Sequence, residues 1–259
     1  MTNQTTIFEI NATTLKLNAT IYLGSNENSV SLPEILFSPV TNDLYVSGFA
    51  NDMLVINPIT FSLVGNYSIN GNPSGLLDGP YHLYYTGGLT LNTNNGDLYL
   101  EVNLANSTNS SSSFQSFVYV LSGANVSLLK YIRIPSGQGY SMVFDNLTGT
   151  VWGSQAITGF NNNNSVDNYL GEIFEINAAS DSVISNYTTG LFSFSMTLDN
   201  STGDILIASV LSSSLTIIDT KPAAIKSYEV NIHETGLAVD IVSSYVPFVS
   251  FIIRFEVVE

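Results

Sequence analysis

The hexapeptide IFEINA occupies residues 7–12 and recurs, residue for residue, at positions 173–178. Identical hexapeptides about 166 residues apart are unexpected by chance in a chain of 259 residues, so they indicate internal repetition. In each copy a glutamate alternates with Ile and Phe, which is the pattern of a β-strand. The chain is therefore expected to contain similar β-rich units.

A second pattern supports the repetition and sets its length. Four times, a turn rich in Asn, Asp, Thr and Gly is followed by an apolar strand, and the first apolar residues are Leu44, Leu98, Val151 and Ile205. These anchors are separated by 54, 53 and 54 residues. Turn residues placed before alternating apolar runs are typical of hairpins.

Each repeat contains four predicted strands, and helical periodicity is nearly absent. The segments before the anchors predict first strands at 35–37, 89–91, 142–144 and 195–198, and the anchors begin the second strands. Third strands are predicted at 54–57, 117–120, 173–176 and 215–219, and fourth strands at 63–69, 128–134, 183–188 and 225–230. Four antiparallel strands in each 40–55 residues is the period of a β-propeller blade.

The sequence thus predicts an all-β fold: one β-propeller domain, residues 1–259, with five blades of four antiparallel strands. The expected blades are 29–70, 80–135, 137–189, 191–231, and a composite of 233–259 with 5–24. In the composite blade the C-terminus supplies strands one and two, and the N-terminus supplies strands three and four. Residues 254–259 could themselves form a third strand, which would either compete with the N-terminal strand or project from the ring.

Two polar segments, 105–113 and 159–167, interrupt their blades between strands two and three and are expected to be exposed loops on one rim. The Asx-rich turns at 145–149 and 199–203 could suggest calcium, but they lack the dense oxygen ligands of a calcium loop. Their Asp, Asn and Gly residues are those that a tight hairpin turn requires.

Charge is scarce and acidic. Charged residues make up 10% of the chain, and 21 acids against 6 Lys and Arg give a net charge of −15. Such a surface cannot neutralise phosphates, which argues against nucleic acid and against anionic membranes as partners. At low pH few charges would remain, so the composition predicts acid tolerance and an acidic habitat. The alternative is a neutral-pH surface protein kept soluble by hydroxyls and glycans.

The location follows from three further features. The chain has no cysteine, and its start shows no signal peptide. The most apolar stretch, 245–253, is far shorter than the roughly 20 residues that span a bilayer, so no membrane span is expected. Eleven Asn-X-Ser/Thr sequons begin at Asn3, Asn11, Asn18, Asn66, Asn106, Asn109, Asn125, Asn146, Asn163, Asn186 and Asn200. Either the protein is intracellular, or the chain is a mature form whose leader has been removed. The sequons favour the second, an extracellular or cell-surface form, with the last eight as glycosylation candidates and Asn11 expected to be silent inside a strand.

Residues 38–75, SPVTNDLYVSGFANDMLVINPITFSLVGNYSINGNPSG, resemble the repeat of the YVTN-type β-propeller family. The matching elements are Leu44-Tyr45-Val46, Val55-Ile56-Asn57 and the linker at 71–75, GNPSG. The other blades match more loosely, and five blades depart from the seven that are common in the family. The resemblance implies an exported surface protein of archaea or bacteria. The repeat carries packing residues, so it implies no catalytic site.

The chain offers few candidates for chemistry. The two histidines, His82 and His233, enter blades two and five and could meet near a central channel as metal ligands; the alternative is surface histidines, and no metal or cofactor is expected. Glu9 and Glu175 of the two hexapeptides are expected on different blades, so they do not form a paired-carboxylate site. No serine has the local context of a nucleophile elbow.

Three hypotheses of function remain. The first is a non-enzymatic surface propeller for adhesion or assembly in a surface layer, filament or coat, with other surface proteins, copies of itself or glycans as partners. The second is a sugar- or peptide-binding module at the channel mouth, with Tyr81, Tyr84 and Tyr85 as a stacking platform. The third is a lyase or hydrolase of the kind that some propellers host.

Overall fold

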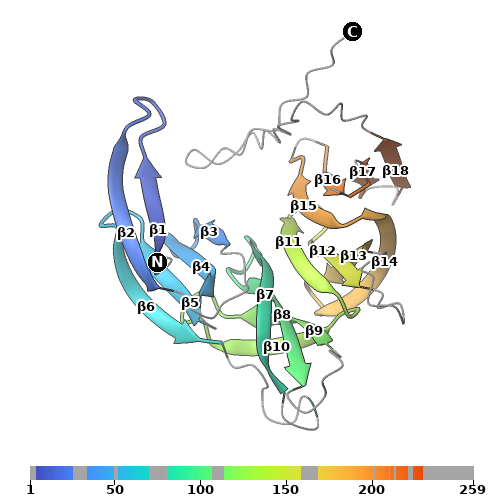
Figure 1. The fold of residues 1–259 in the computed structure, drawn as a ribbon, viewed down its shortest axis with the longest axis horizontal. Helices are drawn as coiled ribbons and strands as arrows, with labels where there is room; N and C mark the ends of the chain where they lie inside the picture. The colour runs from blue at the N-terminus through green and yellow to red at the C-terminus, as the bar shows by residue number, and fades with distance from the viewer. Residues whose placement is uncertain are drawn as a thin grey trace. The chain divides into compact units, whose positions relative to one another are not determined.

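The computed structural model is all-β (Figure 1). It describes residues 4–25, 34–49, 52–69, 77, 81–106, 114–158, 169–200, 202–209, 211–212, 214–220 and 224–229, and this part of the chain contains no helix. Two compact units, Met1–Ser136 and Gly137–Glu259, are described one at a time. Their boundary falls between the second and third predicted blades, and the single domain over 1–259 stays a prediction.

The first unit contains one two-stranded and two four-stranded antiparallel sheets. The hairpin is formed by β1 (Gln4–Ile10) and β2 (Leu17–Ser25). Blade one consists of β3 (Ile35–Ser38), β4 (Asp43–Phe49), β5 (Asp52–Asn57) and β6 (Ser62–Ser68) in sequential order. Blade two consists of β7 (Tyr81–Leu91), β8 (Leu98–Asn106), β9 (Phe114–Leu121) and β10 (Leu128–Arg133), again in sequential order.

The second unit contains two further sheets of the same topology. Blade three consists of β11 (Gln138–Asp145), β12 (Thr150–Thr158), β13 (Tyr169–Asn177) and β14 (Ser182–Leu191). Blade four consists of β15 (Ser193–Leu198), β16 (Asp204–Ser209), β17 (Ser214–Asp219) and β18 (Ala224–Glu229). The four meanders confirm the predicted four-stranded antiparallel blades.

Several strands are longer than the sequence pattern indicated, β7 and β8 among them. β7 begins at Tyr81, eight residues before the expected start at Leu89, because irregularities in its pairing let it continue along β8. β8 continues to Asn106, so the first two residues of the predicted loop 105–113 belong to a strand, in which Ala105 pairs with His82. Residues 107–113 and 159–168 of the predicted rim loops lie outside the described residues.

The N-terminal half of the predicted composite blade is present as the β1–β2 hairpin. Its proposed C-terminal half, 233–259, lies outside the described residues, so closure of the propeller by the two termini stays a prediction. One face of the hairpin packs on blade one, where Ile7 and Ile21 join Val46, Leu54 and Ile56. The other face exposes apolar residues, among them Phe8, which is 60% exposed.

The repeated hexapeptide has the same secondary structure in both places. Each copy forms a strand, β1 or β13, and its asparagine lies where the turn into the next strand begins. Asn11 Oδ1 accepts hydrogen bonds from the backbone N–H groups of Thr13 and Thr14. In the second copy, Asn177 Oδ1 accepts hydrogen bonds from the backbone N–H groups of Ala179 and Ser180. This Asx geometry tightens the turn. Asn11 therefore lies in a turn, and the expectation that it sits inside a strand was wrong.

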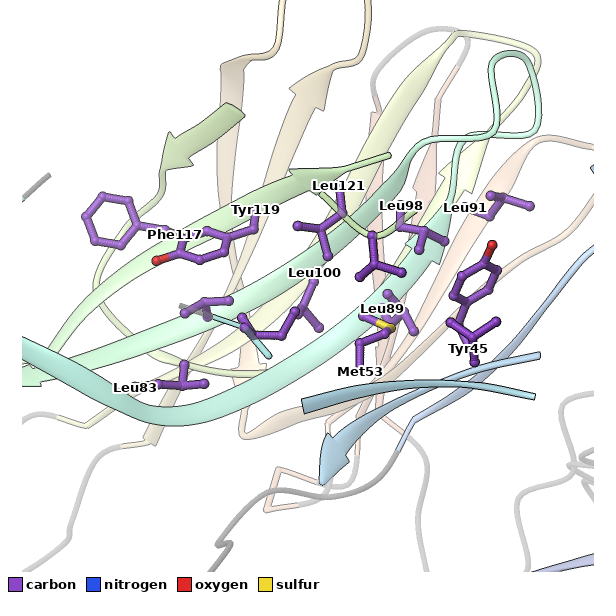
Figure 2. Close-up of a cluster of buried hydrophobic side chains, with 14 of the residues drawn as sticks. Tyr45, Met53, Leu83, Leu89, Leu91, Leu98, Leu100, Phe117, Tyr119 and Leu121 are labelled. Atoms are coloured by element: carbon purple, nitrogen blue, oxygen red, sulfur yellow. The ribbon is translucent and has the colours of Figure 1, made fainter. Parts of the chain in front are cut away.

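The core of the first unit lies between blades one and two (Figure 2). Tyr45 and Met53 of blade one pack with β8, whose alternate residues Leu98, Leu100 and Val102 are fully buried. Burying each such leucine is worth about 1.5–3 kcal/mol. A corresponding core joins blades three and four, where Trp152 and Ile173 pack with Ile205. Each blade thus buries apolar side chains against its neighbour, as the stacked units of repeat proteins do.

The two Asx-rich turns are hairpin turns, as predicted. Gly149 and Gly203 have φ values of 71° and 82°, a region that favours glycine. Asp145 closes its turn from the side chain: Oδ1 accepts from Leu147 N at 2.9 Å and Oδ2 accepts from the Thr148 hydroxyl at 2.6 Å. The oxygens of Asp145 serve the turn itself.

Candidate functional site

The predicted histidine pair cannot be assembled from the described residues. His82 is exposed on β7, and His233 lies outside the described residues. Within the described part of the chain, no group of three or more His, Cys, Asp or Glu is arranged to hold a metal ion. The metal hypothesis stays a prediction. Likewise, no helix of the described residues is long and apolar enough to cross a membrane.

The predicted tyrosine platform is divided between two environments. Tyr84 is 43% exposed, whereas Tyr85 is 2% exposed and belongs to the interior. Tyr81 is half-buried against the core of blades one and two. The cause is an irregularity of β7: Leu83 pairs with Leu104 and Tyr85 with Asn103, so Tyr84 is an extra residue that the bulge turns outward. Only Tyr84 of the three offers a largely accessible ring.

The two hexapeptide glutamates lie on different sheets, as expected. Glu9 accepts a hydrogen bond from Asn18 Nδ2 at 3.2 Å within the hairpin. Glu175 is half-buried on β13, and burial raises the pKa of its carboxyl, although a hydrogen bond from Ser185 opposes this effect. Burial also raises the pKa of Glu172 on the same strand.

A more strongly perturbed carboxyl belongs to Glu34, which the sequence did not single out. Glu34 immediately precedes β3, and its carbonyl oxygen accepts from Ser47 N at 3.0 Å, which extends the β3–β4 ladder by one pair. Burial raises the pKa of its carboxyl to about 7. A carboxyl near this value can act as a general acid or base, but catalysis requires a nucleophile or electrophile in reach, which the contacts of Glu34 do not define.

Glycosylation candidates are distributed over turns and outer strands. Asn125, Asn146 and Asn200 lie in exposed turns, and Asn66 and Asn186 are exposed on β6 and β14, the last strands of their blades. Asn106 is half-buried at the end of β8. Asn109 and Asn163 lie outside the described residues.

An aromatic group that the sequence reasoning missed lies in the second unit. Tyr140 of β11 contacts Phe192, with ring centroids 4.9 Å apart, and Phe194 of β15, at 5.2 Å. The rings of Phe192 and Phe194 are nearly parallel, at 10° and 6.0 Å. These separations are those of favourable aromatic pairs. We call Tyr140, Phe192 and Phe194 the aromatic triad.

Two members of the triad are bulge residues of first strands. Gly139 pairs with Gln155 and Ser141 with Ser154, which leaves Tyr140 as the extra residue. In blade four, Ser193 pairs with Ser209 and Ser195 with Ala208, which leaves Phe194 as the extra residue. The two bulges occur at the same place in their blades. Each lies opposite the residues three and four positions after the anchor, which are Ser154 and Gln155 in blade three and Ala208 and Ser209 in blade four. A bulge turns the side chain of its extra residue out of the regular alternation of the strand.

A group of hydrogen-bonded hydroxyls lies at the start of blade four. Ser193 lies between Phe192 and Phe194 in the sequence, and its hydroxyl bonds to Ser209 at 3.1 Å and to Thr189. Ser212 Oγ accepts from Leu191 N at 2.9 Å, beside the link between blades three and four. Gly190 is required in this link, since a Cβ there would lie 2.2 Å from Ser212 Oγ. Ser193 and Ser209 are buried, so their hydroxyls belong to the interior of blade four.

Comparisons with known proteins support the fold. No protein-family model matches the sequence, and no curated protein matches it. Among solved structures, the chain is similar to U3-55K, with a TM-score of 0.51 and 8% identity over 80% of this chain and 53% of the other. It is equally similar to the WD40 repeats of RRP9, at 0.51 and 8%, over 80% and 52%.

A third similar structure is the dihydro-heme d1 dehydrogenase NirN, with a TM-score of 0.45 and 15% identity over 82% of this chain and 40% of the other. The chain spans about half the length of the first two structures. With these likenesses and its own four-stranded meanders, the protein is a β-propeller. The likenesses concern the fold alone.

Proposed function

We propose that the protein is a non-enzymatic, N-glycosylated β-propeller of the cell surface that serves adhesion or assembly. Its partners would be other surface proteins, copies of itself or glycans. The proposal extends the sequence hypothesis, and the resemblance of residues 38–75 to the YVTN-type repeat agrees with it. The placement of the sequon asparagines is the observation that carries it.

Sequon asparagines avoid the interior. The side chains of eight of them are described, and each is exposed or half-buried: Asn11, Asn18, Asn66, Asn106, Asn125, Asn146, Asn186 and Asn200. By contrast, the buried asparagines Asn92 and Asn103, 5% and 2% exposed, do not belong to sequons. Asparagines outside sequons, such as Asn42, Asn94 and Asn95, are also exposed, so the accessible sequons permit glycosylation without being distinguished from other asparagines.

Asn125 has the most favourable local geometry for a glycan. Its Oδ1 accepts from Ser127 N at 3.1 Å and from the Ser127 hydroxyl at 2.7 Å, and Ser127 is the third residue of its sequon. Both bonds use the amide oxygen, whereas a glycan is attached through Nδ2. Asn125 is exposed in the turn between β9 and β10, so a glycan there would meet solvent.

The test is glycopeptide mass spectrometry of the protein from its native source, combined with labelling of intact cells by a membrane-impermeant reagent. Asn125→Gln and Asn66→Gln should each remove one glycan mass, and the native protein should be labelled. Asn42→Gln, an exposed asparagine outside any sequon, is the matched control and should leave the glycan mass unchanged. Unmodified sequons, or protection from the reagent in intact cells, would contradict the proposal.

A second candidate function is ligand binding at a channel mouth. The Tyr81–Tyr85 platform supports it weakly, because Tyr85 is buried.

A further inference from the structure

A dipeptide that is prone to chemical modification lies in the turn between β7 and β8. Asn95 is followed there by Gly96. Asparagine deamidates most readily before glycine, because glycine has no side chain to hinder attack by its own backbone nitrogen. Asn95 is exposed to the water that the reaction consumes. Sequence and exposure therefore both favour deamidation at this position.

The reaction requires freedom of two groups. The Gly96 nitrogen gives up its proton and forms a bond to Asn95 Cγ, while the Cγ–Nδ2 bond breaks and the amide nitrogen leaves as ammonia, which carries the proton away. The succinimide ring so formed takes up one water and opens either to aspartate or to isoaspartate, in which the main chain runs through Cγ. The Asn95 side chain must therefore turn its Cγ onto the Gly96 nitrogen, and that nitrogen must lose its hydrogen bond.

The hairpin turn restrains both groups. Gly96 N donates to Asn92 O at 2.8 Å, so its proton is held by a carbonyl oxygen. Asn95 Nδ2 donates to Asp97 Oδ2 at 2.6 Å, and Asn95 Oδ1 accepts from Asp97 N at 3.0 Å. Asp97 thus holds both polar atoms of the Asn95 amide, so that Cγ cannot turn freely. The bond to its carboxylate is the stronger of the two.

Conversion of Asn95 would disturb a close contact between two turns of blade two. Gly96 is buried with a φ of 83°, and its carbonyl oxygen lies against Gly123, where an added Cβ would clash with it. The Tyr45 hydroxyl of blade one donates to the carbonyl oxygen of the same Gly123. Isoaspartate at position 95 adds one main-chain atom before Gly96 and displaces this contact. Aspartate at position 95 replaces the hydrogen bond to Asp97 by repulsion between two carboxylates.

We propose that Asn95–Gly96 is a latent deamidation site, and that Asp97 is the positioning residue that keeps it closed in the folded protein. The reaction then proceeds only when the turn opens. Its products weaken the turn, so a converted turn does not return to the original state. The inference rests on contacts within the first unit and is independent of the proposed surface function.

The experiment measures conversion of Asn95 by peptide mass spectrometry. The full chain is incubated at pH 8, folded or unfolded in urea, in water enriched in heavy oxygen, so that only conversion during the incubation carries the label. Asn95 should convert at least about tenfold more slowly in the folded wild type than in urea. Asp97→Ala should raise the ratio of the folded rate to the urea rate about tenfold, the factor for loss of one hydrogen bond to a charged group. The ratio isolates the turn, because a direct effect of residue 97 on the chemistry is present in both states.

Two further variants separate the role of Asp97 from general loss of stability. Asp97→Asn keeps an oxygen that can accept from Asn95, so its ratio should lie between those of wild type and Asp97→Ala. Asn57→Ala is the matched control, since Asn57 closes the β5–β6 turn through bonds from the backbone N–H groups of Ile59 and Thr60. It should leave the ratio for Asn95 unchanged.

Three results would overturn the proposal. Asn95 could convert in the folded wild type as fast as in urea, or Asp97→Ala could leave the ratio unchanged. Asn57→Ala could also raise the ratio as much as Asp97→Ala, which would show that stability alone controls the reaction. The converted protein should melt at a lower temperature than the unconverted protein, and an equal melting temperature would overturn the inferred effect on the turn.

Discussion

Replacing Glu34 by glutamine should make the protein more stable at pH 8 and leave its stability unchanged at pH 4. Glu34 faces Ser47 across the β3–β4 ladder, so their side chains lie on the same face of blade one. Leu36 and Tyr45, two residues away on each strand, belong on that face to the core of blades one and two. The carboxyl therefore sits at the margin of an apolar core.

The magnitude follows from the pKa. Burial raises the pKa of Glu34 from 4.5 to about 7, which corresponds to about 3 kcal/mol of preference for the protonated form in the folded state. Between these two values the folded protein binds more protons than the unfolded chain. The contribution of Glu34 to the free energy of unfolding is therefore fully present below pH 4.5 and is lost as the pH rises through 7. Glutamine has no such transition.

Urea unfolding of both proteins from pH 4 to pH 8 provides the measurement. The difference in unfolding free energy, variant minus wild type, should grow by about 2–3 kcal/mol across this range, with its midpoint between pH 5 and 7. Taking the difference removes the contributions of Glu172 and Glu175, whose pKa values burial also raises. Parallel pH profiles for the two proteins would refute the reasoning.

Three further predictions concern packing and closure. Deletion of residues 1–24 should unfold or aggregate the protein, because the predicted composite blade would lose half its sheet. An unchanged melting temperature in thermal scans would contradict closure by the two termini. Gly153→Ala should cost about 1–3 kcal/mol in urea unfolding, since its Cβ would lie 2.1 Å from the buried ring of Phe174, and a neutral effect would show that the ring can shift. The wild-type melting temperature should not fall when the pH is lowered from 7 to 4, because the raised pKa values of Glu34 and Glu175 favour the folded state in acid. A cooperative loss of structure near pH 4, followed by circular dichroism, would exclude acid tolerance.

The sequence by itself determined the strands, their grouping into four meanders and the turns between them. These features are local: apolar alternation defines a strand, and an aspartate such as Asp145 closes its turn through hydrogen bonds from the residues two and three positions on. The spacing of 53 or 54 residues between anchors then fixes the blade repeat. Exposed turn positions for sequons such as Asn125 follow from the same local signals.

Tertiary structure alone decided which side chains are accessible and which are perturbed. The identical hexapeptides show why: Phe174 is fully buried in blade three, where Gly153 of β12 leaves room for its ring, whereas Phe8 in the hairpin is 60% exposed. Bulges likewise depend on the partner strand, so the outward turn of Tyr84 and the meeting of Tyr140 with Phe194 could not be read from alternation. Burial is set by neighbours distant in the sequence, and a local pattern does not contain them.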